Sequence, residues 1–292
     1  MMSRLLANMD DWNQFWFSAR APGAIAMVRM LIGAIAAIQF AMYLFAGANW
    51  LGANGWFDQD AGLYFVGNDV QGTGSQYRWS ILYAVPGLVP VVAIVGLIGS
   101  LATLLGLGSR LAPLVAWIAL TQFHHRAPFL VSTHEPLLGA TLAYLLVDTG
   151  RLNWTLRPGI CSGSSRISAN ISLQLIRTHF WIWVGFSLSS MLANSSWWNG
   201  EACWLLIQSG HGWIPLSDGW QWVAHLFTHG VIGSQFGILV ATTHPQLRWL
   251  GRWFLYFFLM CIVLFLGDWL YAAVLLATST AIWPLGAVGS RL

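Results

Sequence analysis

The amino-acid sequence predicts an all-α protein: a polytopic membrane helix bundle of about eight transmembrane helices, with cytoplasmic N- and C-termini. Three observations support this fold class. The 292-residue chain is 57% hydrophobic and only 8% charged, whereas about 25% of the residues in a soluble domain are charged. Long apolar runs recur along the whole chain with short breaks between them. The arginines gather on one side of these runs, as the positive-inside rule requires.

Residues 1–22 precede the first apolar run and predict a short helix lying on the cytoplasmic face of the membrane. Trp12, Phe15 and Trp16 recur at helical spacing before Pro22, and an aromatic helix face suits the membrane interface. No cleavage pattern of a signal peptide follows the first apolar run. We therefore expect that run to be retained as the first span.

The transmembrane domain is expected over residues 23–286. A helix needs roughly 20 apolar residues to cross a bilayer. Eight segments approach this, at residues 23–45, 81–107, 111–123, 137–147, 171–193, 220–242, 249–266 and 269–285. The third and fourth segments are short, so they are tilted, extended into their shared loop or re-entrant. A count of seven spans therefore stays open beside eight.

The arginines predict which side of the membrane each loop occupies. With the N-terminus inside, ten of the thirteen arginines fall in or beside cytoplasmic segments, the bias expected of a cytoplasmic face. They are Arg4, Arg20, Arg110, Arg151, Arg157, Arg166, Arg177, Arg248, Arg252 and Arg291. The connections are then an outer loop at residues 47–79, a cytoplasmic linker at 150–170 and a short cytoplasmic tail at 287–292.

The composition also excludes several classes of function. The chain contains no lysine, so a phosphate-binding loop of the GKS/GKT type and a Schiff-base enzyme are both ruled out. A net charge of +3 on a mostly apolar chain gives no basic patch for nucleic acid. The three cysteines, Cys161, Cys203 and Cys261, are widely spaced and indicate neither a metal site nor a disulfide framework.

The densest group of titratable side chains lies around the predicted outer ends of the third and fourth spans. It consists of His124, His125, Arg126, His134 and Glu135. A histidine and a carboxylate close together can share proton transfer, and an arginine can hold an anionic head group. These five are the candidate catalytic residues. The alternative is a polar outer loop in which Arg126 holds backbone carbonyls.

Three further sets of residues are candidate sites. Arg29 lies inside the first span, where a charge is costly unless it is paired or reaches the lipid head groups, and Asp148 is its expected ion-pair partner. His179, Trp183, Ser190 and Asn194 follow one face of the fifth span and are candidates to line a pocket. A contact between helices is the alternative for that face.

His225 and His229 are four residues apart on the sixth span and so share a helix face. Two such imidazoles can bind a metal ion or a haem, although a protein metal site needs a third ligand, for which His179 and His211 are the candidates. The alternative is a pair of hydrogen-bonded interior histidines.

Several different short motifs occur one after another along the chain. They are Arg29, Trp56-Phe57, Trp79-Ser80, the turn of Gly106, Ser109 and Arg110, His125-Arg126-Ala127-Pro128, His134-Glu135-Pro136-Leu137-Leu138, Gln174 with Phe180 and Trp181, and Trp198-Asn199-Gly200-Glu201-Ala202. In this order the motifs resemble the horizontally transferred transmembrane (HTTM) domain, the membrane part of vitamin K-dependent gamma-carboxylases. The resemblance covers most of the chain.

The departures from that family bear on function. The resemblance implies that a lysine would act as the base toward vitamin K hydroquinone, a few residues before Trp198, but this stretch reads Ser190-Met191-Leu192-Ala193-Asn194. Gamma-carboxylation is therefore disfavoured. The large lumenal domain of the carboxylases also has no counterpart in this sequence. The short bacterial members of the family are the better comparison, which implies a bacterial inner (cytoplasmic) membrane.

Three functions follow as hypotheses. The first is an accessory role, either as a subunit of a membrane assembly or in the maturation and export of a secreted protein partner. Under this hypothesis the protein is not expected to be an enzyme. The second is an intramembrane enzyme that acts on a lipid or quinone-like substrate through the His/Glu/Arg cluster. The third is an electron-transfer subunit with a metal or haem at His225 and His229. The lipid bilayer is a partner in all three, and nucleic acid in none.

Overall fold

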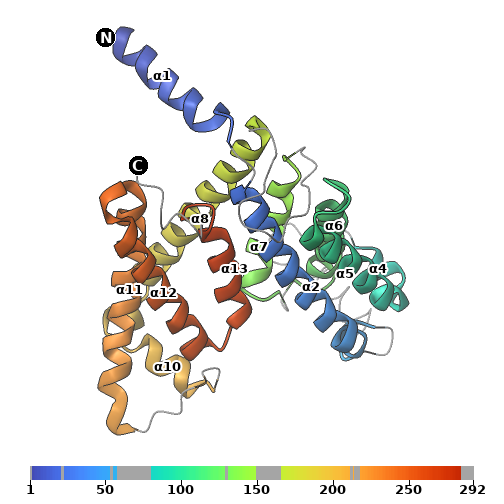
Figure 1. Cartoon of the computed structure of the whole chain (residues 1–292). Coiled ribbons are helices and arrows are strands. Elements are labelled where there is room, and N and C mark those ends of the chain that lie inside the picture. The colour runs from blue at the N-terminus through green and yellow to red at the C-terminus, as the bar shows by residue number, and fades with distance from the viewer. Residues whose placement is uncertain are drawn as a thin grey trace. The chain divides into compact units, whose positions relative to one another are not determined.

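The computed structural model describes residues 2–20, 23–52, 55–57, 80–128, 131–148, 166–210, 213 and 218–283 (Figure 1). The described residues are helical apart from turns and one isolated bridge, between Arg20 and Arg166. The all-α prediction is therefore confirmed for this part of the chain. The chain divides into two compact units, residues 1–174 and 175–292, and each is described by itself.

Among the described residues, six α-helices precede α8 (Ile167–Ala193) in the chain. They are α1 (Met2–Phe17), α2 (Gly23–Leu51), α4 (Ile81–Ala84), α5 (Val89–Leu105), α6 (Leu111–Arg126) and α7 (His134–Leu145), with the 3-10 turn η2 (Pro86–Leu88) between α4 and α5. The first unit ends within α8 (Ile167–Ala193). In this unit α2 lies beside α5, and α6 and α7 complete the group (Figure 1).

Small residues let α2, α5 and α6 approach closely. A side chain added at Gly33 of α2 would lie 2.5 Å from the backbone nitrogen of Leu104 on α5, and one at Gly99 of α5 would lie 2.9 Å from the backbone nitrogen of Ala116 on α6. Small residues at such contacts are the usual device for bringing membrane helices together. This close approach fixes the positions of α2 and α6 relative to each other.

The α1 helix is attached to the start of α8 by hydrogen bonds. The Asn170 side-chain amide donates to the carbonyl oxygens of Phe15 and Trp16 at 2.8 and 2.9 Å, and the Gln174 amide donates to Phe15 at 2.8 Å. These amides satisfy carbonyl groups that the last turn of a helix leaves without partners.

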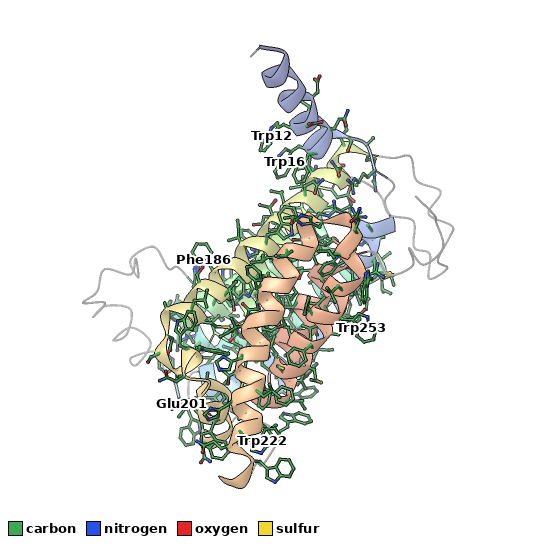
Figure 2. All side chains as sticks on the ribbon, turned by 90° about the vertical axis from the view of Figure 1, so that its left-hand side faces the viewer. Trp12, Trp16, Phe186, Glu201, Trp222 and Trp253 are labelled. Atoms are coloured by element: carbon green, nitrogen blue, oxygen red, sulfur yellow. The ribbon has the colours of Figure 1, made fainter. Side chains whose placement is uncertain are left out.

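The second unit contains the rest of α8 together with α9 (Ser195–Trp198), α10 (Ala202–Gln208), α11 (Gln221–Thr243), α12 (Arg248–Cys261) and α13 (Trp269–Ser279). The 3-10 turns η4 (Asp218–Trp220) and η5 (Pro245–Leu247) precede α11 and α12, and the π-helix η6 (Ile262–Leu266) extends α12. A side chain at Gly237 would collide with the ring of Phe254, so α11 and α12 pack closely. Phe186, Trp222 and Trp253 are exposed on this unit (Figure 2).

Within the described residues, four helical segments are long and apolar enough to cross a membrane: residues Gly23–Leu51, Pro86–Leu105, Gln221–Thr243 and Arg248–Leu266. The protein is thus of the integral membrane type. Each of the eight predicted segments overlaps a helix, but α6, α7 and α13 have only 16, 12 and 11 residues. The number of spans and the side on which the termini lie therefore remain predictions.

The predicted loop boundaries differ from the helix ends. Residues 47–51, placed in the outer loop, continue α2, and α8 begins at Ile167, inside the predicted linker at 150–170. Residues 58–79, 149–165 and the predicted tail at 287–292 lie outside the described residues.

Candidate functional site

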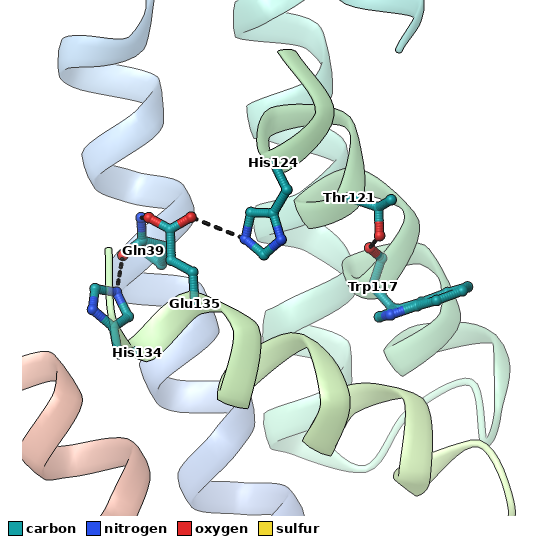
Figure 3. A network of polar contacts seen from close by, with 6 residues as sticks. All are labelled: Gln39, Trp117, Thr121, His124, His134 and Glu135. Atoms are coloured by element: carbon teal, nitrogen blue, oxygen red, sulfur yellow. Dashed lines mark hydrogen bonds and ion pairs between the residues drawn. The ribbon is translucent and has the colours of Figure 1, made fainter. Parts of the chain in front are cut away.

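Three helices of the first unit bring four polar side chains together. Gln39 comes from α2, His124 from the last turn of α6, and His134 and Glu135 from the first turn of α7 (Figure 3). We call these four residues the Glu135 site. Glu135 and His134 are each only 3% exposed, and Gln39 is 4% exposed. The sequence predicted three of the four as one cluster.

The contacts within the Glu135 site form a chain. His134 Nε2 lies 2.9 Å from Gln39 Oε1, and Gln39 Nε2 donates a 3.2 Å hydrogen bond to Glu135 Oε1. The second carboxylate oxygen, Oε2, lies 2.9 Å from His124 Nε2, with angles that fall outside those of a hydrogen bond. Since the Gln39 carbonyl can only accept, His134 donates through Nε2.

Local structure explains how these side chains come to face one another. Glu135 lies in the first turn of α7, where the helix dipole favours a negative charge, and His124 lies in the last turn of α6, where it favours a positive one. A carboxylate so deeply buried must be hydrogen-bonded or paired. Gln39 and His124 supply those two interactions.

Glu135 also lines a cavity of about 270 Å³ between α2, α6 and the start of α7. Its lining is mostly apolar and includes three aromatic rings. The lining residues are Gln39, Met42, Tyr43, Ala46, Gly47, Trp50, Leu51, Phe123, Ala127, Val131, Ser132 and Glu135. The Tyr43 and Phe123 rings stack with centroids 4.1 Å apart. The cavity thus joins an apolar wall to a buried carboxylate.

Arg126 and His125 are placed by different contacts. The Arg126 side chain is fully buried, donates to the Phe57 carbonyl at 3.1 Å and lies over the rings of Phe57 and Tyr83. The Tyr83 hydroxyl donates to the His125 carbonyl at 2.7 Å. These contacts connect the end of α6 to α4 and to residues 55–57. For Arg126 this agrees with the alternative in which it holds a loop carbonyl.

Asp148 forms an ion pair with Arg166. The Arg166 Nη2 to Asp148 Oδ2 distance is 3.5 Å, and Ser168 Oγ donates to Asp148 Oδ1 at 3.2 Å. Arg29 lies within range of the charges of both Asp148 and Arg166. The predicted pair is therefore part of a group with two guanidinium side chains and one carboxylate.

The four side chains of the predicted stripe on α8 have different surroundings. The rings of His179 and Trp183 stack 6.2 Å apart, and Trp183 Nε1 donates to the Tyr271 hydroxyl at 2.8 Å. Asn194 caps α9, and Ser190 is exposed. A cavity of about 170 Å³ in this unit is lined by residues that include Ser187, Met191, Cys203 and Cys261.

His225 and His229 converge on the same turn. A side chain added at Gly200 would lie 3.2 Å from His225 Nδ1 and 3.1 Å from His229 Nε2, so both rings face that backbone. Within the described ranges, no group of three or more His, Cys, Asp or Glu side chains could hold a metal ion. His211, one candidate third ligand, lies outside those ranges.

Sequence reasoning missed Gln39, which joins His134 to Glu135, and Tyr43, whose hydroxyl interacts with Glu135. The available signal was a lone amide inside the apolar run of the first span, because a polar residue in a spanning helix normally faces the interior. Tyr43 follows Gln39 by four residues and therefore shares its helix face.

No family model matches the sequence, and neither the curated proteins nor the solved structures contain a significant match.

Proposed function

We propose that this membrane protein binds a lipophilic molecule carrying an acidic hydroxyl group, and that Glu135 accepts the hydroxyl proton. This corresponds to an intramembrane enzyme acting on a quinone-like substrate, one of the three hypotheses from the sequence. The observation that carries it is the buried Glu135 carboxylate in the wall of an apolar cavity.

The contacts of Glu135 suit a general base. Gln39 holds one carboxylate oxygen and His124 lies 2.9 Å from the other, so the carboxylate has a fixed orientation. A base must lie within hydrogen-bond reach of the proton that it removes, and Glu135 borders the cavity that would hold the substrate. The His124 imidazole can then accept that proton from Glu135 Oε2 at its Nε2 atom, which returns Glu135 to the carboxylate form.

The cavity lining favours a flat ring over a flexible chain. Tyr43, Trp50 and Phe123 supply aromatic faces, and aromatic rings favour offset stacking with other rings. Pockets for small molecules are mostly apolar with a few placed polar groups, as this one is. A short-chain hydroquinone combines the ring with the hydroxyl and is the probe of choice.

The membrane topology that we propose has eight spans and both termini in the cytoplasm, in a bacterial inner membrane. The resemblance to the HTTM domain supports this scaffold, while the missing lysine argues against the carboxylase reaction. An accessory role for an exported partner remains a prediction from sequence.

Glu135→Gln tests the proposed role, because glutamine keeps the size of the side chain and loses its charge. A hydrogen bond to a charged group contributes about 1.5–3 kcal/mol, so we expect hydroquinone affinity to fall by roughly 10- to 150-fold. Calorimetric titration of the purified full chain in detergent measures this. The matched control is Glu201→Gln, since Glu201 is the only other glutamate and is exposed. Equal affinity in wild type and Glu135→Gln would contradict the proposal.

A further inference from the structure

A second polar group lies in the first unit, apart from the Glu135 site, and contains a buried arginine. We call Arg29, Asp148 and Arg166 the Arg29 cluster. Arg29 is 7% exposed, and its guanidinium lies over Gly106 at the end of α5, where an added Cβ would meet its Nη2 atom. Gly106 has a left-handed backbone (φ 75°), so it both ends α5 and leaves room for the guanidinium.

The positive charges of the Arg29 cluster exceed its negative charge. Asp148 pairs with Arg166 at 3.5 Å and accepts from Ser168, while Arg29 feels the attraction of Asp148 and the repulsion of Arg166. In the part of the chain that the structure describes, no hydrogen bond from the Arg29 guanidinium is found, and its Nε is buried without a partner. A buried guanidinium of this kind calls for another anion.

The surroundings favour the phosphate group of a lipid. Arg29 lies six residues after the start of α2, about 9 Å along the helix at a rise of ~1.5 Å per residue, so its long side chain can extend from there toward the lipid head groups. The turn that carries Gly106 exposes the side chains of Leu107 and Leu111, on which acyl chains can pack. The guanidinium fork matches two phosphate oxygens.

We infer that the Arg29 cluster binds the phosphate group of an anionic phospholipid, with Arg29 and Arg166 as the donors. This inference is independent of the function proposed for Glu135. The site lies at the predicted cytoplasmic end of the helices, where anionic lipids are concentrated.

The test measures the thermal unfolding of the purified full chain in neutral detergent, followed by tryptophan fluorescence. The ligands are dioctanoyl phosphatidylglycerol, dioctanoyl phosphatidylcholine and inorganic phosphate, each titrated separately. We expect phosphatidylglycerol to raise the unfolding temperature of the wild type. In Arg29→Gln, the lipid concentration that gives half of this effect should be at least tenfold higher. The control Arg248→Gln removes an exposed arginine of the second unit and should behave as wild type.

The three ligands distinguish the source of the phosphate. A smaller effect of phosphatidylcholine, whose charge is neutralised by choline, supports an anionic lipid; an equal effect of inorganic phosphate supports the same site with a soluble ligand. If Arg29→Gln does not fold, Arg29→Lys and Arg166→Gln replace it, and each should weaken binding at least tenfold. The inference is overturned if these variants bind like Arg248→Gln, or if none of the ligands stabilises the wild type.

Discussion

At the scale of single residues, helix geometry separates side chains that are neighbours in the sequence. His124, His125 and Arg126 are consecutive on α6, and successive residues of a helix point about 100° apart. His124 reaches Glu135, while Arg126 lies over the rings of Phe57 and Tyr83. The sequence could therefore predict a cluster of titratable groups but not which members meet.

Gln39 shows that residues far apart in the sequence can meet in the site without any local pattern that predicts their contact. It is 96 positions from Glu135 along the chain, and no local spacing connects the two. Their contact depends on α2 packing beside α7, which is a tertiary arrangement. What the sequence did contain was a single amide in an apolar run, and such residues are worth treating as site candidates.

Cys203 of α10, outside the candidate spans, gives a prediction about pH. Burial raises the pKa of its thiol, against a smaller opposite effect of Thr228. The reactive form of a cysteine is the deprotonated thiolate. A raised pKa lowers the thiolate fraction of Cys203 at neutral pH, so its alkylation becomes faster as the pH rises. In a Cys161→Ser, Cys261→Ala background, we expect Cys203 to react with iodoacetamide at least tenfold more slowly at pH 8 than an introduced exposed thiol.

The comparison uses Ser209→Cys in a Cys203→Ala chain, because Ser209 is exposed just after α10. Rates followed by mass spectrometry from pH 7 to pH 10 give both pH profiles. Overlapping profiles for the two thiols would show that Cys203 is not shielded.

At the scale of helices, the apolar runs predicted where helices lie but not all their limits. The α2 helix continues to Leu51, beyond the predicted end at residue 45, because a helix can continue after its apolar run has reached the membrane surface. The boundary between the two units falls inside α8, where no change in composition marks it. The sequence likewise did not predict the α2–α5 contact at Gly33, since a glycine in a span has several possible roles.

Gly33→Ala tests the close approach of α2 and α5. The new Cβ would lie 2.5 Å from a backbone nitrogen, which cannot move aside as a flexible side chain can, so the helices must separate. Overpacking of this kind costs about 1–3 kcal/mol. We expect a lower unfolding temperature, measured in detergent, and weaker hydroquinone binding because α2 carries Gln39.

The matched control is Gly185→Ala, in the middle of α8, where nothing lies within 4 Å of the new atom. Alanine is the better helix former by about 1 kcal/mol, so this variant should be as stable as wild type or slightly more so. If Gly33→Ala is as stable as Gly185→Ala, the result would contradict the close approach of α2 and α5 at Gly33.

At the scale of the whole molecule, the absence of lysine makes the proposed topology unusually easy to measure. Gln208 and Arg248 flank α11, one of the four candidate spans, and both are exposed. Gln208→Lys and Arg248→Lys each introduce a single lysine into a chain that has none. We expect a membrane-impermeant amine reagent to label Gln208→Lys in intact spheroplasts, and Arg248→Lys only after permeabilisation.

The unmodified chain serves as the background, because it has no lysine side chain to react. Labelling of both variants in intact spheroplasts, or of Arg248→Lys alone, would refute the proposed orientation of α11. The same approach extends to every other predicted loop.

The central claim, that the cavity beside Glu135 holds a lipophilic hydroxyl compound, is tested most directly by photo-crosslinking. The probe is a short-chain hydroquinone carrying a diazirine, added to the purified full chain and mapped by mass spectrometry. Tyr43 lines the cavity, whereas Phe45, two residues later on α2, is 83% exposed and reports nonspecific contact with the probe. We predict labelling at Tyr43 or Phe123 that excess unlabelled hydroquinone abolishes; labelling confined to exposed residues such as Phe45, and unaffected by that competitor, would contradict the claim.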